Sequence, residues 1–193
     1  KFLGRHYVEK PGPVLFVQQE DPMPMLINRA STVLGMGLVA LGEQNEIPLP
    51  PLDIPLHWHC ERQLHFNNKA SIAGLIEVVA KLRPRLVIID PLYTTIDIDD
   101  YGASGAQSML LYKRLRDKYG TGFLVAHHTN RNTKDASRER DKIWGSQFLN
   151  AWLETGWQVR MLDTPTDISV TRHFKMAGIP QAVEGKITID AHS

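Results

Sequence analysis

The stretch Leu86-Val87-Ile88-Ile89-Asp90-Pro91 decides the fold class. Four consecutive apolar residues, three of them β-branched, are typical of a central parallel strand that is covered on both faces. The run ends in a carboxylate, Asp90, and the apolar runs at 14–17 and 123–126 are also followed by polar side chains. In an open α/β sheet, ligands bind beyond the carboxyl ends of the strands. The stretch therefore predicts a parallel sheet and the edge of that sheet where chemistry takes place.

Helices are predicted on both sides of this strand. Asn67 and Asn68 are capping residues ahead of an apolar stripe at 72–82, and Pro84 ends that helix. Another helix is expected to begin at Ser104 and to end at Gly120. The remaining expected elements are strands at 14–17, 56–60 and 123–126, a helix at 25–41, a short helix at 148–153, and late strands at 157–162, 168–174 and 186–189. This alternation predicts an α/β fold with a mostly parallel sheet and antiparallel strands at its end.

Composition limits the classes of protein that are possible. The chain has 193 residues, 42% of them hydrophobic, and a net charge of +1, so it fits one globular domain without a global attraction to nucleic acid. Its single cysteine, Cys60, excludes an intrachain disulfide framework and points to a reducing compartment such as the cytoplasm. No apolar run approaches the roughly 20 residues that span a bilayer, so no membrane partner is expected.

The candidate site residues follow three apolar runs. Glu20 comes after the first, Asp90 after the second, and His127 and His128 after the third. A carboxylate at a strand end can hold Mg²⁺ directly or through water, and a second carboxylate can orient an attacking water. A single acid after a strand is commonly an ordinary turn residue, but three polar strand ends in one sheet favour a functional site.

These motifs carry a resemblance to a known family. Residues 14–21, 86–91 and 123–129 together resemble the RecA-like ATPases of the DnaB and RepA type, which are hexameric replicative and plasmid helicases. Lys1-Phe2-Leu3-Gly4-Arg5 resembles the segment that follows the P-loop helix, and Trp144-Gly145-Ser146-Gln147-Phe148 resembles a helix start after the variable loop. The resemblance implies a RecA-like three-layer sandwich in which residues 1–193 form a single ATPase core.

The resemblance also implies roles for individual residues. Glu20 would be the base that activates water, and Asp90 the Walker B acid that holds the Mg²⁺ of ATP. His127 or His128 would sense the γ-phosphate, with His128 also contacting the nucleotide. Arg172 and Lys175 would be basic fingers that reach the ATP of the adjacent subunit, although they do not reproduce the family's Lys-x-Arg spacing. Two exposed charges on an edge strand are an equally good interpretation of that pair.

A charged segment after the third strand is the candidate DNA contact. Residues 129–142 hold five basic and three acidic side chains, and the basic ones are Arg131, Lys134, Arg138, Arg140 and Lys142. Loops at this position line the central channel in ring-shaped relatives, where several basic groups track the phosphate backbone. A solvated surface loop is the competing interpretation.

The chain departs from the family in one respect, because the pattern GxxxxGK[ST] occurs nowhere in its 193 residues. We expect a P-loop upstream of Lys1, so that this chain begins just after the P-loop helix and is inactive as an ATPase by itself. The predicted function of the parent protein is ATP hydrolysis coupled to movement on, or unwinding of, single-stranded or forked DNA in a homohexameric ring.

Three other interpretations stay open. A metal-dependent DNA nuclease on the same scaffold would use Glu20, Asp90 and the acids of the segment Asp97-Ile98-Asp99-Asp100. A non-catalytic assembly or loader module would keep the fold without the P-loop. A zinc site at His57, His59 and Cys60 is disfavoured, because alternation along a strand sends Cys60 to the face opposite the two histidines.

Overall fold

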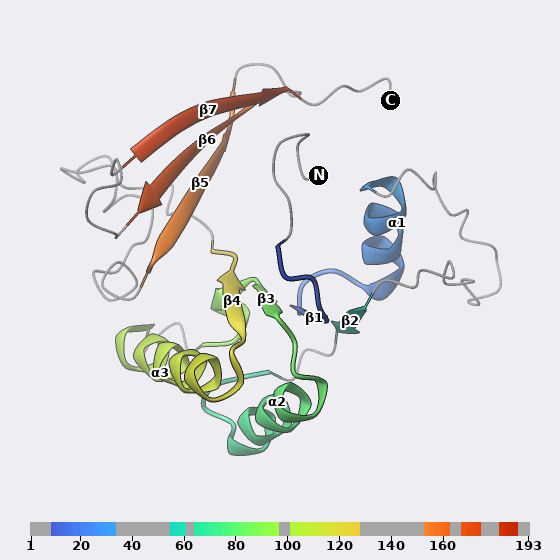
Figure 1. Ribbon diagram of the computed structural model, residues 1–193, viewed down its shortest axis with the longest axis vertical. Coiled ribbons are helices and arrows are strands. Elements are labelled where there is room, and N and C mark those ends of the chain that lie inside the picture. The colour runs from blue at the N-terminus through green and yellow to red at the C-terminus, as the bar shows by residue number, and fades with distance from the viewer. Residues whose placement is uncertain are drawn as a thin grey trace. The chain divides into compact units, whose positions relative to one another are not determined.

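The computed structural model describes residues 9–33, 55–60, 64–96, 101–127, 153–162, 167–174 and 182–188, with backbone alone at 101–104, 173–174 and 182–188. Contacts divide the chain into two compact units, Lys1–His127 and His128–Ser193. Figure 1 shows the elements of both units along the chain. Each unit is described by itself below.

The first unit contains the predicted parallel sheet. Its strands are β1 (Val14–Gln18), β2 (Leu56–His59), β3 (Leu86–Asp90) and β4 (Gly122–Val125), in the order β2-β1-β3-β4. Every neighbouring pair is parallel, and Gln18 is the partner of Asp90 at the end of the β1–β3 ladder. The carboxyl ends of β1 and β3 therefore lie side by side at one edge of the sheet, as expected from the sequence.

Two helices, α2 (Lys69–Leu82) and α3 (Tyr101–Tyr119), supply the apolar core with one face of this sheet. Leu15, Val17, Val87 and Ile89 alternate along β1 and β3 and are all buried. The main helical contributors to the core are Leu75, Val79, Met109, Tyr112 and Leu115. Burial of each such side chain stabilises the fold by about 1.5–3 kcal/mol, so this layer is the main source of stability.

Aromatic packing joins α3 to the sheet. The Tyr112 ring stacks on Phe123 of β4 with the ring centroids 4.6 Å apart, and it meets Phe66 edge-on at 5.6 Å. Burial raises the pKa of Tyr112, and a hydrogen bond with Thr95 opposes this rise more weakly. The tyrosine is therefore a neutral core residue.

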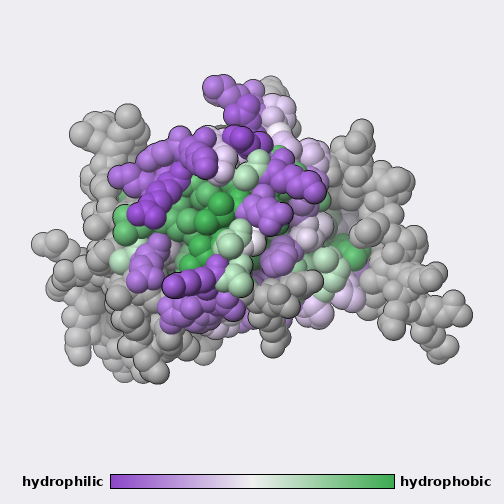
Figure 2. Space-filling model, turned by 90° about the horizontal axis from the view of Figure 1, so that it is seen from below, coloured by the Kyte–Doolittle hydropathy of each residue, from purple (hydrophilic) through white to green (hydrophobic). Residues whose placement is uncertain are grey.

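The outer side of the helical layer carries an apolar patch. Figure 2 shows hydrophobic side chains gathered inside a border of hydrophilic ones on this side of the molecule. A hollow of about 250 Å³ lies between α2 and α3, lined by Phe66, Ile72, Leu110 and Leu111 among others. Leu110 is 55% exposed, so these apolar side chains are accessible to solvent.

The helix boundaries agree with the expected signals in two helices and differ in one start. Asn68 caps α2 by accepting hydrogen bonds from the backbone N–H groups of Ala70 and Ser71. Gly120 follows α3 with a positive φ of 69°, a conformation that glycine adopts without steric cost. Helix α3 begins at Tyr101 rather than at the predicted Ser104. A serine is a common cap but is also tolerated inside a first turn, and this ambiguity explains the error.

The short helix α1 (Met23–Val33) and the 3₁₀ helix η1 (Leu92–Thr94) complete the first unit. Helix α1 begins two residues before the expected start at Met25, and the remainder of that predicted helix, residues 34–41, lies outside the described residues. None of the helices that the structure describes is long and apolar enough to cross a membrane.

The second unit is an antiparallel sheet of its own among the described strands. Its strands β5 (Thr155–Met161), β6 (Asp167–Phe174) and β7 (Ala182–Thr188) pair in chain order. Trp157, Val159 and Met161 share one face of β5 and are each more than half exposed. The three late strands were expected near these positions. The short helix that was expected at 148–153 lies almost wholly outside the described residues.

Candidate active site

The site is built around Gln18, the last residue of β1. Its side chain is only 1% exposed. The amide oxygen accepts a hydrogen bond from the backbone N–H of Glu20 at 2.7 Å, and Nε2 donates to Oδ2 of Asp90 at 3.3 Å and to Oδ2 of Asp21 at 3.4 Å. A neutral amide at this position ties the ends of β1 and β3 together and stabilises two carboxylates by charge-assisted contacts.

Glu20 lies just beyond the end of β1, where it is exposed to solvent. The hydroxyl of Tyr93 donates a hydrogen bond to its Oε1. Tyr93 belongs to η1, which follows the cis peptide bond between Asp90 and Pro91. The loop after β3 therefore orients the carboxylate that follows β1, and Glu20 and Asp90 belong to one cluster.

The η1 segment also reaches the end of β4. The backbone N–H of Leu92 donates to the carbonyl oxygen of Ala126 at 2.9 Å, and the N–H of Ala126 donates to the carbonyl of Ile89 at 2.9 Å. His127 follows directly and is half-buried. The ends of three neighbouring strands, with Glu20, Asp90 and His127, thus meet at the same edge of the sheet.

A second buried glutamine, Gln19, joins this edge to the segment before α2. Its side-chain oxygen accepts from the N–H of Leu64 at 2.8 Å, while Nε2 donates to the carbonyl of Leu64 at 3.1 Å. Nε2 also donates to Oγ1 of Thr94 at 3.0 Å. Both backbone polar groups of one residue are satisfied by a single side chain, which fixes Leu64 relative to β1.

Asp21 brings a positive charge towards the edge. Its Oδ2 forms a salt bridge with Arg29 of α1, in which the Arg29 side chain is 57% exposed. Solvent screens such a pair, so its contribution to stability is about 1 kcal/mol or less. Its main effect is positional, because it links α1 to the end of β1.

One protein family matches the part of the chain that contains this cluster. The family model described as the AAA domain matches residues 1–134, which is more than half of the chain. The chain belongs to the AAA domain family. No curated protein sequence matches it.

The solved structures agree on the fold of this AAA domain. The RadB recombinase has a TM-score of 0.62 and 14% sequence identity, over 93% of this chain and 76% of that one. A second solved structure, which is also an ATPase domain, has a TM-score of 0.61 and 10% identity, over 90% of this chain and 70% of that one. The predicted RecA-like fold and the resemblance to RecA-like ATPases of the DnaB type are thereby confirmed.

The remaining predicted site residues of the AAA domain fall into two groups. Arg172 lies on β6 in the second unit, where it is the ladder partner of Trp157. The others lie outside the described residues, namely His128, Lys175, Arg131, Lys134, Arg138, Arg140 and Lys142. The acids Asp97, Asp99 and Asp100 of the nuclease interpretation lie there too. Their roles stay predictions.

The zinc interpretation receives no support from the described residues. Among them, no group of three or more His, Cys, Asp or Glu side chains is arranged to hold a metal ion. The β1–β2 register pairs Leu15 with His57 and Val17 with His59, so both histidines share the face of the buried Leu15 and Val17. Burial raises the pKa of the nearby Cys60 thiol, which keeps it protonated and a poor metal ligand.

Sequence reasoning missed Gln18, Gln19 and Tyr93. Two consecutive glutamines at the end of an apolar strand resemble the beginning of an ordinary polar turn. The available signal was their position, since a residue that ends a central strand is normally buried and a buried amide needs partners. Tyr93 lies three residues after Asp90, a spacing with no general meaning.

The residues of this edge fit a magnesium-bound nucleotide. Asp90, Asp21 and Glu20 place three carboxylates around the amide of Gln18, and carboxylate oxygens are the ligands that Mg²⁺ prefers. Asp90 would hold the ion, and Glu20, which is further out and exposed, would face the reacting water.

Proposed function

We propose that this AAA domain is the core of an ATP-driven motor that hydrolyses ATP at the carboxyl edge of β1, β3 and β4. The observation that carries the proposal is the Gln18 amide, which contacts Asp90 and the backbone of Glu20 at once. An ATPase needs one carboxylate near the metal and a second near the attacking water, held at a fixed separation. The Gln18 contacts support that arrangement.

Bound Mg²⁺ and ATP would supply the electrophilic γ-phosphorus and neutralise the charge on the phosphate oxygens. Glu20 would accept a hydrogen bond from the attacking water and then its proton. The Tyr93 hydroxyl, by holding Oε1, would leave Oε2 of Glu20 directed at the water. His127 or His128 at the end of β4 would donate a hydrogen bond to the γ-phosphate.

The motor would act on DNA as a ring, with a homohexamer as the expected assembly. The family membership supports ATP hydrolysis, and the resemblance to hexameric helicases supports DNA translocation or unwinding, with single-stranded or forked DNA as substrate. In such a ring Arg172 and Lys175 would approach the ATP of a neighbouring subunit and stabilise the charge of the transferred phosphoryl group. This arrangement would couple hydrolysis to relative movement of subunits.

The metal site can be tested with this chain directly. Mn²⁺, used in place of Mg²⁺ and added with ATP, should broaden the backbone NMR signals of Gln18, Glu20 and Asp90 through paramagnetic relaxation. Asp90→Asn should weaken Mn²⁺ binding about tenfold, because it removes a charged ligand. The control Asp117→Asn changes an exposed acid of α3 and should leave the affinity unchanged. Equal Mn²⁺ affinity in both variants would overturn the assignment of Asp90.

Catalysis can be tested in the full-length product of the gene, because GxxxxGK[ST] is absent from these 193 residues. Glu20→Gln should lower the DNA-stimulated ATPase rate by a factor on the order of 10² while ATP still binds, since it removes only the proton acceptor. An unchanged rate would contradict the role of Glu20. DNA cleavage with metal alone, abolished by Asp90→Asn, would instead establish the nuclease interpretation, and ring formation with neither activity the assembly module.

The proposed DNA contact has its own test. Arg138→Ala and Arg140→Ala should each weaken single-stranded DNA binding and lower the dependence of log K on log salt by about 0.7 per lost phosphate contact. Lys113→Ala, which removes an exposed charge from α3, is the matched control. Unchanged affinity and salt dependence in both arginine variants would show that residues 129–142 do not bind the phosphate backbone.

A further inference from the structure

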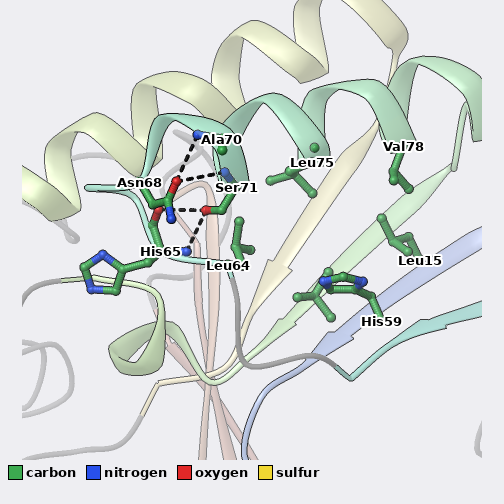
Figure 3. A pocket seen from close by; sticks show the side chains of 11 residues that line it. Leu15, His59, Leu64, His65, Asn68, Ala70, Ser71, Leu75 and Val78 are labelled. Atoms are coloured by element: carbon green, nitrogen blue, oxygen red, sulfur yellow. Dashed lines mark hydrogen bonds between the residues drawn. The ribbon is translucent and has the colours of Figure 1, made fainter.

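The largest cavity among the described residues lies between α2 and the strands β1 and β2. Its volume is about 550 Å³, which falls in the range of about 300–1,000 Å³ typical of small-molecule sites. Leu15 and Val17 of β1 form the floor, and Leu75 and Val78 of α2 form one wall (Figure 3). The cavity is therefore a mainly apolar pocket between the helix and the edge of the sheet.

Most polar groups in the wall of this pocket are already satisfied. The side-chain oxygen of Asn68 accepts from the N–H groups of Ala70 and Ser71. The Ser71 hydroxyl accepts from the N–H of His65 and donates to its carbonyl, both at 2.9 Å (Figure 3). An apolar ligand that covers these groups leaves no hydrogen bond broken, so its burial carries little desolvation cost.

The His59 ring is the remaining polar group of the wall. It comes from the end of β2 and lies beneath α2, on the same side as Leu15 (Figure 3). Within the described part of the chain, no hydrogen bond to this ring is present, and the ring is only half-buried. A neutral imidazole has one donor and one acceptor, so it can recognise a hydroxyl or similar group.

Gly74 leaves an opening in the helical wall. A Cβ atom built on this glycine meets nothing within 4 Å. The position lies in the interior of α2, where glycine costs about 1 kcal/mol of helix stability relative to alanine. The absent side chain enlarges the cavity, and a larger residue at this position would fill it.

We propose that this pocket binds a compact, uncharged apolar molecule, aromatic or branched aliphatic, that carries one hydrogen-bonding group for His59. The described lining contains no Lys or Arg, so a phosphate or other strongly anionic ligand is disfavoured. The pocket is lined by none of Gln18, Glu20 and Asp90, and the proposal does not depend on ATP hydrolysis.

The test compares two probes that differ in a single hydroxyl, 4-ethylphenol and ethylbenzene. Each is titrated into the isotopically labelled chain while the backbone NMR signals of Ser71, Gly74 and Leu75 are followed. We expect saturable shifts at these positions for both probes. 4-Ethylphenol should bind about fivefold more tightly, the equivalent of one net hydrogen bond. His59→Leu should abolish this preference while retaining ethylbenzene binding.

Two leucine substitutions on the same helix separate filling of the pocket from general effects. Gly74→Leu should weaken both probes about tenfold or more, because the new side chain occupies the cavity. Ala73→Leu adds the same side chain at an exposed position outside the lining and should change affinity by less than about twofold. Thermal melts establish that both variants fold, and Gly74→Ala, with a smaller effect of the same sign, replaces Gly74→Leu if the latter does not.

Three results would overturn the proposal. The first is the absence of saturable shifts at the pocket residues, and the second is equal affinity in Gly74→Leu and the parent chain. The third is a set of shifts confined to the exposed apolar residues of β5, which would place the probes on another surface. Loss of nucleotide binding at the carboxyl edge would leave all three readouts intact, so failure of the ATPase proposal is distinguishable.

Discussion

Gln18 shows how one buried side chain organises the candidate site. Its amide is surrounded by the carboxylates of Asp21 and Asp90 and by the N–H of Glu20. A donor nitrogen facing two carboxylates and an acceptor oxygen facing an N–H satisfy every partner with a neutral group. A charged residue of the same size would leave at least one of these contacts repulsive.

The isosteric change Gln18→Glu tests this arrangement. It replaces the donor that faces Asp21 and Asp90 with a carboxylate oxygen, so we expect the free energy of unfolding to fall by about 1–3 kcal/mol. Urea denaturation at neutral pH measures the loss. The same substitution at the exposed Gln107 of α3 should change stability by about 0.5 kcal/mol or less. Equal stabilities for the two variants would show that the Gln18 amide has no special role.

At the scale of elements, α2 matters most because its amino end borders both the pocket and the segment held by Gln19. Asn68 caps the helix and also lines the pocket, while Leu64 and His65 precede it. The stability of this end therefore determines how well the pocket wall is defined.

Asn68→Ala should lower the free energy of unfolding by about 1 kcal/mol, because the N–H groups of Ala70 and Ser71 lose their acceptor. Asn67→Ala changes the preceding residue, which does not cap the helix, and serves as the matched control. Chemical denaturation of both variants gives the comparison. A larger loss for Asn67→Ala than for Asn68→Ala would contradict the capping assignment.

The elements were predictable where local chemistry repeats. The buried run before Asp90, the asparagine cap of α2 and the terminal Gly120 each have one common structural meaning, and all three were confirmed. The meeting of Glu20 and Asp90 also followed, since parallel strands share an edge. The partners of Gln18, Gln19 and Tyr93 did not follow, because they join residues 45–75 positions apart or lie in a loop with no sequence signature.

At the scale of the whole molecule, the two units present different surfaces. The first unit buries one face of its sheet beneath helices, whereas the second leaves Trp157, Val159 and Met161 of β5 largely exposed. An exposed apolar face on an edge strand favours association with another protein surface.

Lysine substitutions on β5 should therefore reduce self-association. Val159→Lys and Met161→Lys place charges on the apolar face, and we expect each to weaken association about tenfold or more in sedimentation velocity across a concentration series. Thr155→Lys adds the same charge at an exposed polar position of that strand. If all three variants associate like the parent chain, the β5 face is not a contact surface.

The double hydrogen bond between Gln19 and the Leu64 backbone has a thermodynamic consequence. Leu64 is part of the pocket wall, and Gln19 immediately precedes Glu20, so the two sites share one rigid joint. If a pocket ligand changes nucleotide affinity by some factor, the nucleotide must change the affinity of that ligand by the same factor. Measuring either binding constant with and without the other ligand would thus report the strength of communication in both directions.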